Sequence, residues 1–140
     1  MDPRKNLPDP GDRSDDKPPS EYRDRIDDLV AGARDARAGF DPPANPPDED
    51  RAMDFCREGL GPVVMTYVRA HGGGGWTEFS GGELDDLHEA LNTYLELYAA
   101  CYGVDVEADV TIRKAAEVLI ETHNIRDVAQ LLTDVPDRHG

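Results

Sequence analysis

Lysine is almost missing from this sequence, which contains only Lys5, Lys17 and Lys114 among its 140 residues. Acidic residues number 30 and basic residues 15, so the net charge at pH 7 is −15. Proteins that bind nucleic acids usually present a basic surface to the phosphates. The charge balance therefore argues against simple binding of DNA or RNA.

A long hydrophobic run is also missing. No stretch approaches the roughly 20 apolar residues of a membrane-spanning helix. The first residues, MDPRKNLPDPGD, lack the apolar core of a signal peptide. We therefore expect a cytoplasmic protein with no membrane segment. The two cysteines, Cys56 and Cys101, lie on or beside apolar helix faces, and we expect buried thiols there rather than a disulfide.

Recognisable metal and catalytic motifs are missing as well. The four histidines form neither a His-x-x-x-His pair nor a site with a Cys-x-x-Cys pair, the spacings that offer two ligands from one element. His88 falls on an apolar face, where we expect an imidazole at the edge of the core. No Ser–His–Asp or Cys–His arrangement can be assembled. The sequence thus predicts no metal, no cofactor and a non-enzymatic protein.

The acidic residues that are present have a particular distribution. Aspartate outnumbers glutamate, arginine far outnumbers lysine, and acids occur throughout the predicted helices. This bias resembles that of proteins from salt-accumulating halophilic archaea. In molar salt the Debye length is about 3 Å, so self-repulsion is screened while the charge keeps the surface soluble. The resemblance implies a protein of a halophilic cytoplasm.

The strongest structural signal runs from Phe79 to Tyr102. Ser80 and Glu83 have the spacing of a capping box, and Gly103 follows where a left-handed residue ends many helices. Leucines and tyrosines at helical spacing form a wide apolar face. The polar side is expected to hold Asp85, Asp86, Glu89, Asn92, Thr93 and Glu96. The pattern predicts a central helix at about 83–102.

Around this helix the sequence predicts an all-α domain over residues 48–136, a compact bundle of four or five short helices. A second amphipathic pattern covers 48–71, and Pro62 predicts a kink or a break with a new helix starting there. Residues 104–110 alternate between apolar and acidic but have no strand to pair with, so we expect a connector.

The pair of helices expected within 111–133 begins at caps provided by Asp109 or Thr111 and by Asn124. Their inward sides are expected to include Ile120 and Leu131, together with Ile112, Ala115, Ala116, Leu119, Ile125, Val128, Ala129 and Leu132.

The first fifty residues differ in composition and hold nine of the eleven prolines. We expect a disordered acidic tail over 1–19, an amphipathic helix over 20–40 that Ser20 can cap, and a Pro-rich linker over 41–47. The helix has an apolar stripe of Tyr22, Ile26, Leu29 and Val30. The stripe has two open interpretations: it docks on its own core, or it lies in the groove of a partner.

Three functional hypotheses follow. The sequence favours an interaction or regulatory module whose partner is another protein, bound through the stripe of Tyr22, Ile26, Leu29 and Val30. The alternative is a DNA-associated regulator that uses the helical pair 111–133, although the glycine usual at a helix-turn-helix turn is absent. Its contacts would come from Arg113, Lys114, Arg126 and Gln130.

The third hypothesis is a small enzyme or ligand binder near the glycine loop 72–76, with His71 and Trp76. Ser80-Gly81-Gly82, at a helix start, could also bind an anion, but loop closure explains these glycines adequately.

Overall fold

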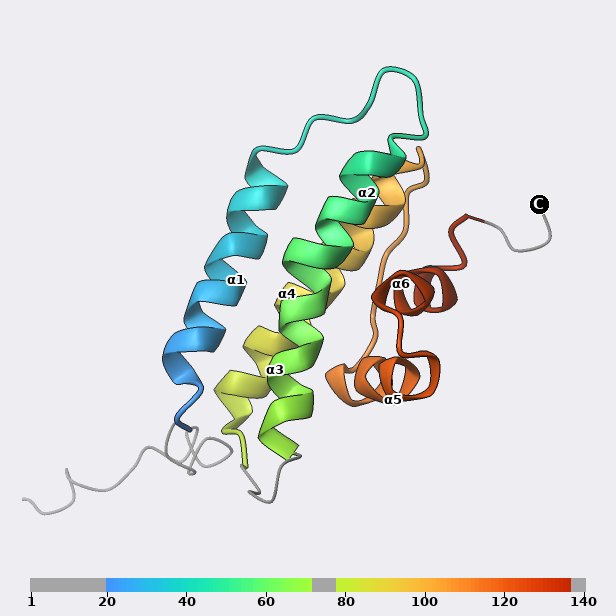
Figure 1. The fold of residues 1–140 in the computed structure, drawn as a ribbon. Helices are drawn as coiled ribbons and strands as arrows, with labels where there is room; N and C mark the ends of the chain where they lie inside the picture. The colour runs from blue at the N-terminus through green and yellow to red at the C-terminus, as the bar shows by residue number, and fades with distance from the viewer. Residues whose placement is uncertain (1–19, 72–77, 137–140) are drawn as a thin grey trace, which may run out of the picture.

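The computed structural model describes residues 20–71 and 78–136, and these form helices without any strand (Figure 1). The predicted all-α class is therefore confirmed. The predicted tail over 1–19 and the loop 72–76 with Trp76 lie outside the described residues. The elements are α1 (Arg23–Ala38), α2 (Glu49–Phe55), the π-helical segment η3 (Cys56–Leu60), α3 (Gly61–His71), α4 (Gly81–Cys101), α5 (Ile112–Thr122) and α6 (Ile125–Thr133).

The central helix is α4, as the sequence predicts. The Ser80 hydroxyl accepts a hydrogen bond from the Glu83 amide at 3.1 Å, and the Glu83 carboxylate accepts one from the Ser80 amide at 2.9 Å. Gly103 adopts φ +80°, the predicted left-handed conformation. The predicted placement of Thr93 on the polar side is wrong, because only 7 % of it is exposed. Neighbouring helices cover α4 on several sides, which makes the buried surface wider than its apolar face.

Helix α1 packs along α4 and runs in the same direction (Figure 1). Its buried residues are Ile26, Leu29, Val30 and Ala33. Ion pairs accompany this contact: Arg23 with Asp86 at 2.6 Å, Arg34 with Glu89 at 2.6 Å, and Arg37 with Glu96. Of the two interpretations of the stripe, the structure therefore has α1 docked on the chain's own core.

Ser20 has a different role from the predicted helix cap. The first helical residue is Arg23, and Tyr22 occupies the N-cap position without a side-chain hydrogen bond. Ser20 instead donates its amide and its hydroxyl to the Glu83 carboxylate, at 3.0 and 2.8 Å. Glu83 is fully buried, so one carboxylate joins the start of α1 to the start of α4.

Helices α2 and α3 form one continuous rod through η3. Asp48 caps α2 by accepting from the Arg51 amide. The sequence predicts a kink or a break at Pro62 with a new helix starting there. The structure has no break, because the chain passes through a π-helical turn just before the proline, and α3 begins at Gly61, one residue before the predicted start. The Gly61 amide reaches back five residues to the Cys56 carbonyl, and this wider turn accommodates a proline that has no amide to donate.

The connector and the last two helices complete the core. Residues 104–110 are extended and unpaired with any strand among the described residues, as predicted, and the Ala108 amide donates to the Glu96 carboxylate at 2.9 Å. Thr111 and Asn124 cap α5 and α6. The inward assignment of Ile120 and Leu131 is wrong: their exposed fractions are 60 % and 45 %.

Candidate partner-binding groove

An open groove of about 400 Å³ lies where α1, η3, α3, α5 and α6 meet. We call it the arginine groove, because three of its lining residues are arginines. Its lining consists of Arg25, Arg57, Gly61, Pro62, Met65, Arg69, Leu119 and Ile125. The arginines come from α1, η3 and α3, so the groove is a product of the tertiary fold.

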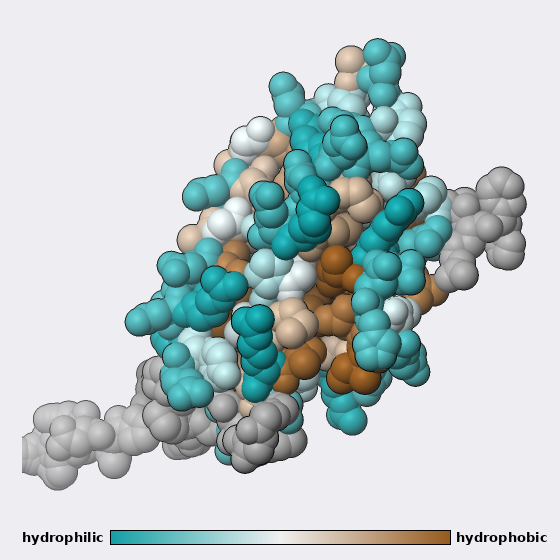
Figure 2. Space-filling model, viewed as in Figure 1, coloured by the Kyte–Doolittle hydropathy of each residue, from teal (hydrophilic) through white to brown (hydrophobic). Residues whose placement is uncertain are grey.

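The floor of the groove is apolar. Pro62, Met65, Leu119 and Ile125 are half-buried, so part of each side chain remains in contact with solvent. Figure 2 shows hydrophobic side chains gathered between α3 and the α5–α6 pair, with hydrophilic side chains on both sides. Such a surface can bury the apolar side of a ligand while its rim contacts polar groups.

The three arginines at the rim are exposed and differ in their pairing. Arg57 pairs with Asp54 at 2.6 Å. Arg25 and Arg69 make no ion pair and no side-chain hydrogen bond within residues 20–71 and 78–136. Guanidinium groups bind carboxylates with two parallel hydrogen bonds, so Arg25 and Arg69 can accept acidic groups from a ligand.

Local sequence explains how α3 brings its share of the groove together. Arg57, Gly61, Met65 and Arg69 are spaced by four residues. In a straight α-helix that spacing drifts by about 40° at every step, and the wider π turn at 56–60 reduces the drift at the first step. The absence of a side chain at Gly61 also lets α3 approach α6 closely. A Cβ at this position would lie 3.8 Å from the Ile125 side chain and 3.1 Å from the Cys56 carbonyl.

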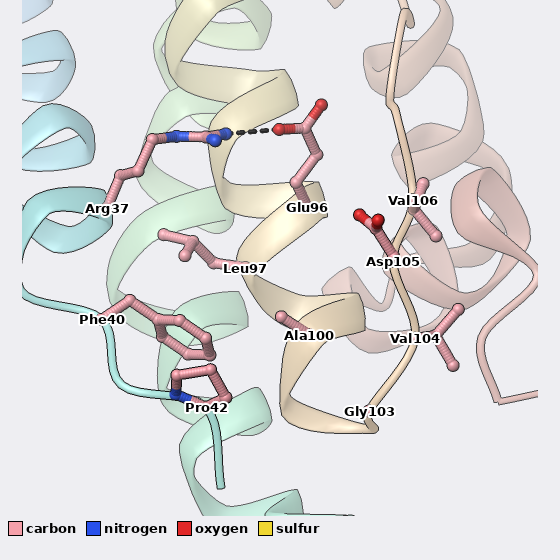
Figure 3. Close-up of a pocket in the computed structure, with 10 residues that line it drawn as sticks. All are labelled: Arg37, Phe40, Pro42, Glu96, Leu97, Ala100, Gly103, Val104, Asp105 and Val106. Atoms are coloured by element: carbon pink, nitrogen blue, oxygen red, sulfur yellow. Dashed lines mark hydrogen bonds and ion pairs between the residues drawn. The ribbon is translucent and has the colours of Figure 1, made fainter.

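A second depression, of about 380 Å³, lies between the C-terminal ends of α1 and α4 and the connector (Figure 3). Of its three charged residues, Arg37, Glu96 and Asp105, the first two are already paired within the protein. Arg37 pairs with Glu96, which also accepts the Ala108 amide. The Arg51 guanidinium lies over the Phe40 ring, 4.6 Å from the ring centroid. Internal pairing makes this depression a weaker candidate than the arginine groove.

The residues predicted to bind a partner lie on the α1–α4 contact. Ile26, Leu29 and Val30 are buried in the core. Tyr22 is half-buried, and its ring meets the Phe79 ring edge-on at 6.0 Å. A partner could contact this stripe only if α1 first left α4.

The residues predicted to contact DNA lie on α5 and α6. Arg113 and Lys114 are exposed, and Arg113 pairs with Glu117 at 3.5 Å. Arg126 is exposed, whereas the Gln130 side chain donates to the Pro136 carbonyl at 3.0 Å. None of the four lines the arginine groove.

The third predicted site can be described only at His71. Its ring is half-buried against Tyr67, with 4.3 Å between centroids, and meets the Phe79 ring edge-on at 5.7 Å. His71 thus belongs to an aromatic cluster at the end of α3. The anion site considered at Ser80-Gly81-Gly82 has its Ser80 and Glu83 amides engaged by the capping box.

The two buried thiols and the buried Tyr98 hydroxyl serve packing. Both cysteines are buried free thiols, as predicted, and burial raises the pKa of Cys56 to about 12. Burial also raises the pKa of Tyr98, whose hydroxyl donates to the Val135 carbonyl at 2.7 Å. A thiol with a raised pKa is a poor nucleophile. Within the described residues, no group of three or more potential metal ligands occurs.

The membrane prediction can be examined over residues 20–71 and 78–136. None of the helices there has both the length and the apolar content needed to cross a bilayer.

Sequence reasoning did not single out the arginine groove. The sequence analysis assigns no binding role to Arg25, Arg57 or Arg69. One signal was present in the sequence. Arg57, Gly61, Met65 and Arg69 are spaced by four residues, so an arginine stands at each end of this row and a small and an apolar residue stand between them. Their convergence with α1, α5 and α6 could not be predicted without the packing.

Comparison with known proteins gives one match. A family model covers residues 20–137, from the start of α1 past the end of α6, and its description is a domain of unknown function. No curated protein and no solved structure matches the chain.

Proposed function

The chain belongs to the DUF8055 family, and we propose that it is a non-enzymatic interaction module that binds an acidic, amphipathic protein segment in the arginine groove. The observation that carries this proposal is that Arg25 and Arg69, which make no ion pair within residues 20–71 and 78–136, lie above an apolar floor. Lys114 and Arg126 also make no ion pair among the described residues, but neither of them lines this groove. A segment with apolar residues on one side and carboxylates on its flanks would satisfy both features.

The setting that we propose is the cytoplasm of a halophilic archaeon. The support is the acidic, lysine-poor composition, together with two buried free thiols that suit a reducing compartment. Self-repulsion of this charge should reduce compactness when salt is removed. Circular dichroism in molar KCl and in dilute buffer measures this directly, and unchanged helicity in dilute buffer would count against a halophilic origin.

The binding proposal is tested with a labelled synthetic peptide that has leucines on one helical face and glutamates on its flanks. Its matched control has lysine in place of every glutamate. Titration of the full chain should show saturable binding of the acidic peptide and no binding of the lysine peptide. Charge reversal at the rim, by Arg25→Glu or Arg69→Glu, should weaken binding roughly tenfold, equivalent to about 1.4 kcal/mol. Arg113→Glu reverses an exposed arginine outside the groove and should bind as the wild type does.

Location can be separated from charge by a photo-cross-linking residue at Met65 on the groove floor. The acidic peptide should cross-link at this position and lose the cross-link when Arg69 is reversed. The groove would be refuted as the binding site if the acidic and the lysine peptides bound equally. A cross-link at Met65 that persists in Arg69→Glu would refute it as well.

The DNA-associated alternative has less support from the arrangement of its residues. Acidic Glu117 accompanies Arg113, and Gln130 is engaged with Pro136. A gel-shift assay in high salt tests it: a shift that Arg126→Glu abolishes would favour this function over ours, and absence of any shift with the wild type would remove it.

A further inference from the structure

The depression between the C-terminal ends of α1 and α4 has the size of a small-molecule site (Figure 3). Its volume of about 380 Å³ lies within the range of about 300–1,000 Å³ that is typical of ligand pockets. Part of its lining is apolar and consists of Phe40, Pro42, Leu97 and Ala100. These side chains can contact the apolar body of a small ligand.

Contacts within the chain hold the walls of this depression in place. The Val104 amide donates to the Ala99 carbonyl at 3.1 Å, and the Ala108 amide donates to the Glu96 carboxylate at 2.9 Å. These two hydrogen bonds tie the connector to α4. On the opposite side of the connector's first turn, a Cβ at Gly103 would lie 2.9 Å from a side chain of the linker 41–47. The depression is therefore already formed before any ligand binds.

The charged residues around the depression leave one carboxylate for a ligand. Arg37 and Glu96 pair with one another, and the neighbouring Arg51 pairs with Asp48 at 3.6 Å. Asp105 makes no ion pair and no side-chain hydrogen bond within residues 20–71 and 78–136. Unpaired carboxylates are common on a chain with 30 acidic and 15 basic residues. Asp105 differs in that it lines a depression with apolar walls, and Figure 3 shows its side chain pointing from the connector toward α4.

The ends of α1 and α4 add negative charge beside the depression. The two helices run in the same direction and end at Ala38 and Cys101, close to the lining residues Phe40 and Ala100. A helix C-terminus has a partial charge of about −0.5, which a basic residue in the last turn offsets. Helix α1 has Arg37 in its last turn, whereas α4 has no basic residue there. A cation in the depression would interact favourably with the end of α4 as well as with Asp105.

We propose that this depression binds a small organic cation, an ammonium group on a short apolar body. The body contacts Phe40, Leu97 and Ala100, and the ammonium group faces Asp105. An inorganic cation would gain nothing from the apolar lining, and an anion would meet a carboxylate and two helix ends of its own sign. The site is separate from the arginine groove, whose rim is cationic, so it goes beyond the function proposed above.

Three ligands that share one body and differ in charge test the proposal: n-hexylammonium, 1-hexanol and hexanoate. NMR titration of the full chain in molar KCl follows the methyl resonances of Leu97 and Ala100. Hexylammonium should shift them and bind roughly fivefold more tightly than hexanol, and hexanoate should bind most weakly. Because salt screens only the charged part of the interaction, the preference for the ammonium should grow as KCl is lowered. Circular dichroism defines the KCl range in which the chain stays folded.

Substitutions separate the charge of the site from its apolar lining. Asp105→Asn removes the charge at nearly constant size and should abolish the preference for hexylammonium over hexanol. Asp109→Asn makes the same change at an exposed connector residue outside the lining and should bind as the wild type does. Ala100→Leu fills part of the depression while Asp105 remains, and it should weaken binding of all three ligands. Circular dichroism of each variant establishes that it is folded.

Three outcomes would overturn the proposal. The first is that no ligand shifts the Leu97 and Ala100 resonances, and the second is that hexanol binds as tightly as hexylammonium. The third is that Asp109→Asn reduces the preference as much as Asp105→Asn does, which would assign it to the net charge of the chain. None of these outcomes bears on the binding of the acidic peptide, so this site and the arginine groove are tested separately.

Discussion

The α1–α4 contact and the arginine groove each contain three arginines, yet the two regions use them differently. Those at the contact all pair with carboxylates of α4: Arg23, Arg34 and Arg37. Those at the groove are Arg25, Arg57 and Arg69, of which only Arg57 has an ion pair in the described residues. Arg23 and Arg25 are two residues apart on one helix, and the helical turn sends them to different regions. Pairing, rather than residue type, thus separates arginines that join helices from arginines available to a ligand.

The largest effect should come from the apolar part of the α1–α4 contact. Ile26→Ala removes a fully buried side chain and leaves a cavity, which should lower the free energy of unfolding by about 3 kcal/mol. Denaturant unfolding in molar KCl measures the loss. Ile120→Ala makes the same change on an exposed side chain and should cost well under about 1 kcal/mol. Equal losses would mean that α1 is not part of the cooperative core.

A smaller loss is expected at the buried carboxylate that joins α1 to α4. Glu83→Gln keeps the shape but replaces a charged acceptor by a neutral amide facing the amides of Ser20 and Ser80. Charge-assisted hydrogen bonds are worth more than neutral ones, so we expect about 2 kcal/mol. Glu83→Asp, which keeps the charge but shortens the reach, separates charge from distance. A wild-type midpoint for Glu83→Gln would show that the carboxylate does not hold α1.

The same residue gives a pH dependence with a definite sign. Burial favours the neutral form, but hydrogen bonds from Ser80 and Ser20 outweigh it and hold the pKa of Glu83 below its usual value. A lowered pKa in the folded state stabilises the fold above the unfolded pKa of about 4.3. This contribution is lost as the pH falls through the folded pKa. Acid unfolding of Glu83→Gln should therefore be less steep there than that of the wild type.

Removal of an ion pair from the α1–α4 contact should have a still smaller effect. Arg23→Met retains a long apolar side chain and loses the 2.6 Å pair with Asp86 and the pair with Asp27. The arginine is partly exposed, so we expect a loss of about 0.5–1 kcal/mol that shrinks as salt is added. Thermal melting over a range of KCl concentrations measures both quantities. A loss that does not change with salt would assign the effect to packing.

The smallest effect on stability is expected in the groove. Arg69→Ala removes a side chain with no ion pair within the described residues, and the free energy of unfolding should change by less than about 0.5 kcal/mol. Binding of the acidic peptide should nevertheless weaken. A loss of stability as large as that of Arg23→Met would show that the groove arginines support the fold, and the contrast between the two regions would disappear.

Local signals predicted the helices well where the causes are local. The capping box at Ser80 and Glu83, the caps at Thr111 and Asn124, and the left-handed Gly103 each depend on residues a few positions apart. Predictions that depended on neighbours in space were less successful. Ser20 binds Glu83 across 63 residues instead of capping its own helix. Ile120 and Leu131 fit the apolar pattern, yet they are 60 % and 45 % exposed.

The candidate site illustrates the same division. Periodicity can place Arg57, Met65 and Arg69 on one side of a helix, but cannot say which other helix supplies Arg25 or Leu119. Gly59 is a further case. A Cβ there would lie 2.4 Å from the Tyr94 ring, a constraint set by the approach of η3 to α4. The sequence therefore predicts only which residues share one side of a helix, and the packing of the helices brings those sides together as a groove.

By itself the sequence determined an all-α chain with a capped central helix, buried thiols and an acidic surface, because caps, helical periodicity and charge act within a few residues or through composition alone. The tertiary structure decided that α1 lies on the core, that Pro62 is accommodated by a π turn, and that three arginines meet above an apolar floor. Those features depend on which helices touch and at what angle, and contacts between residues far apart in sequence fix that.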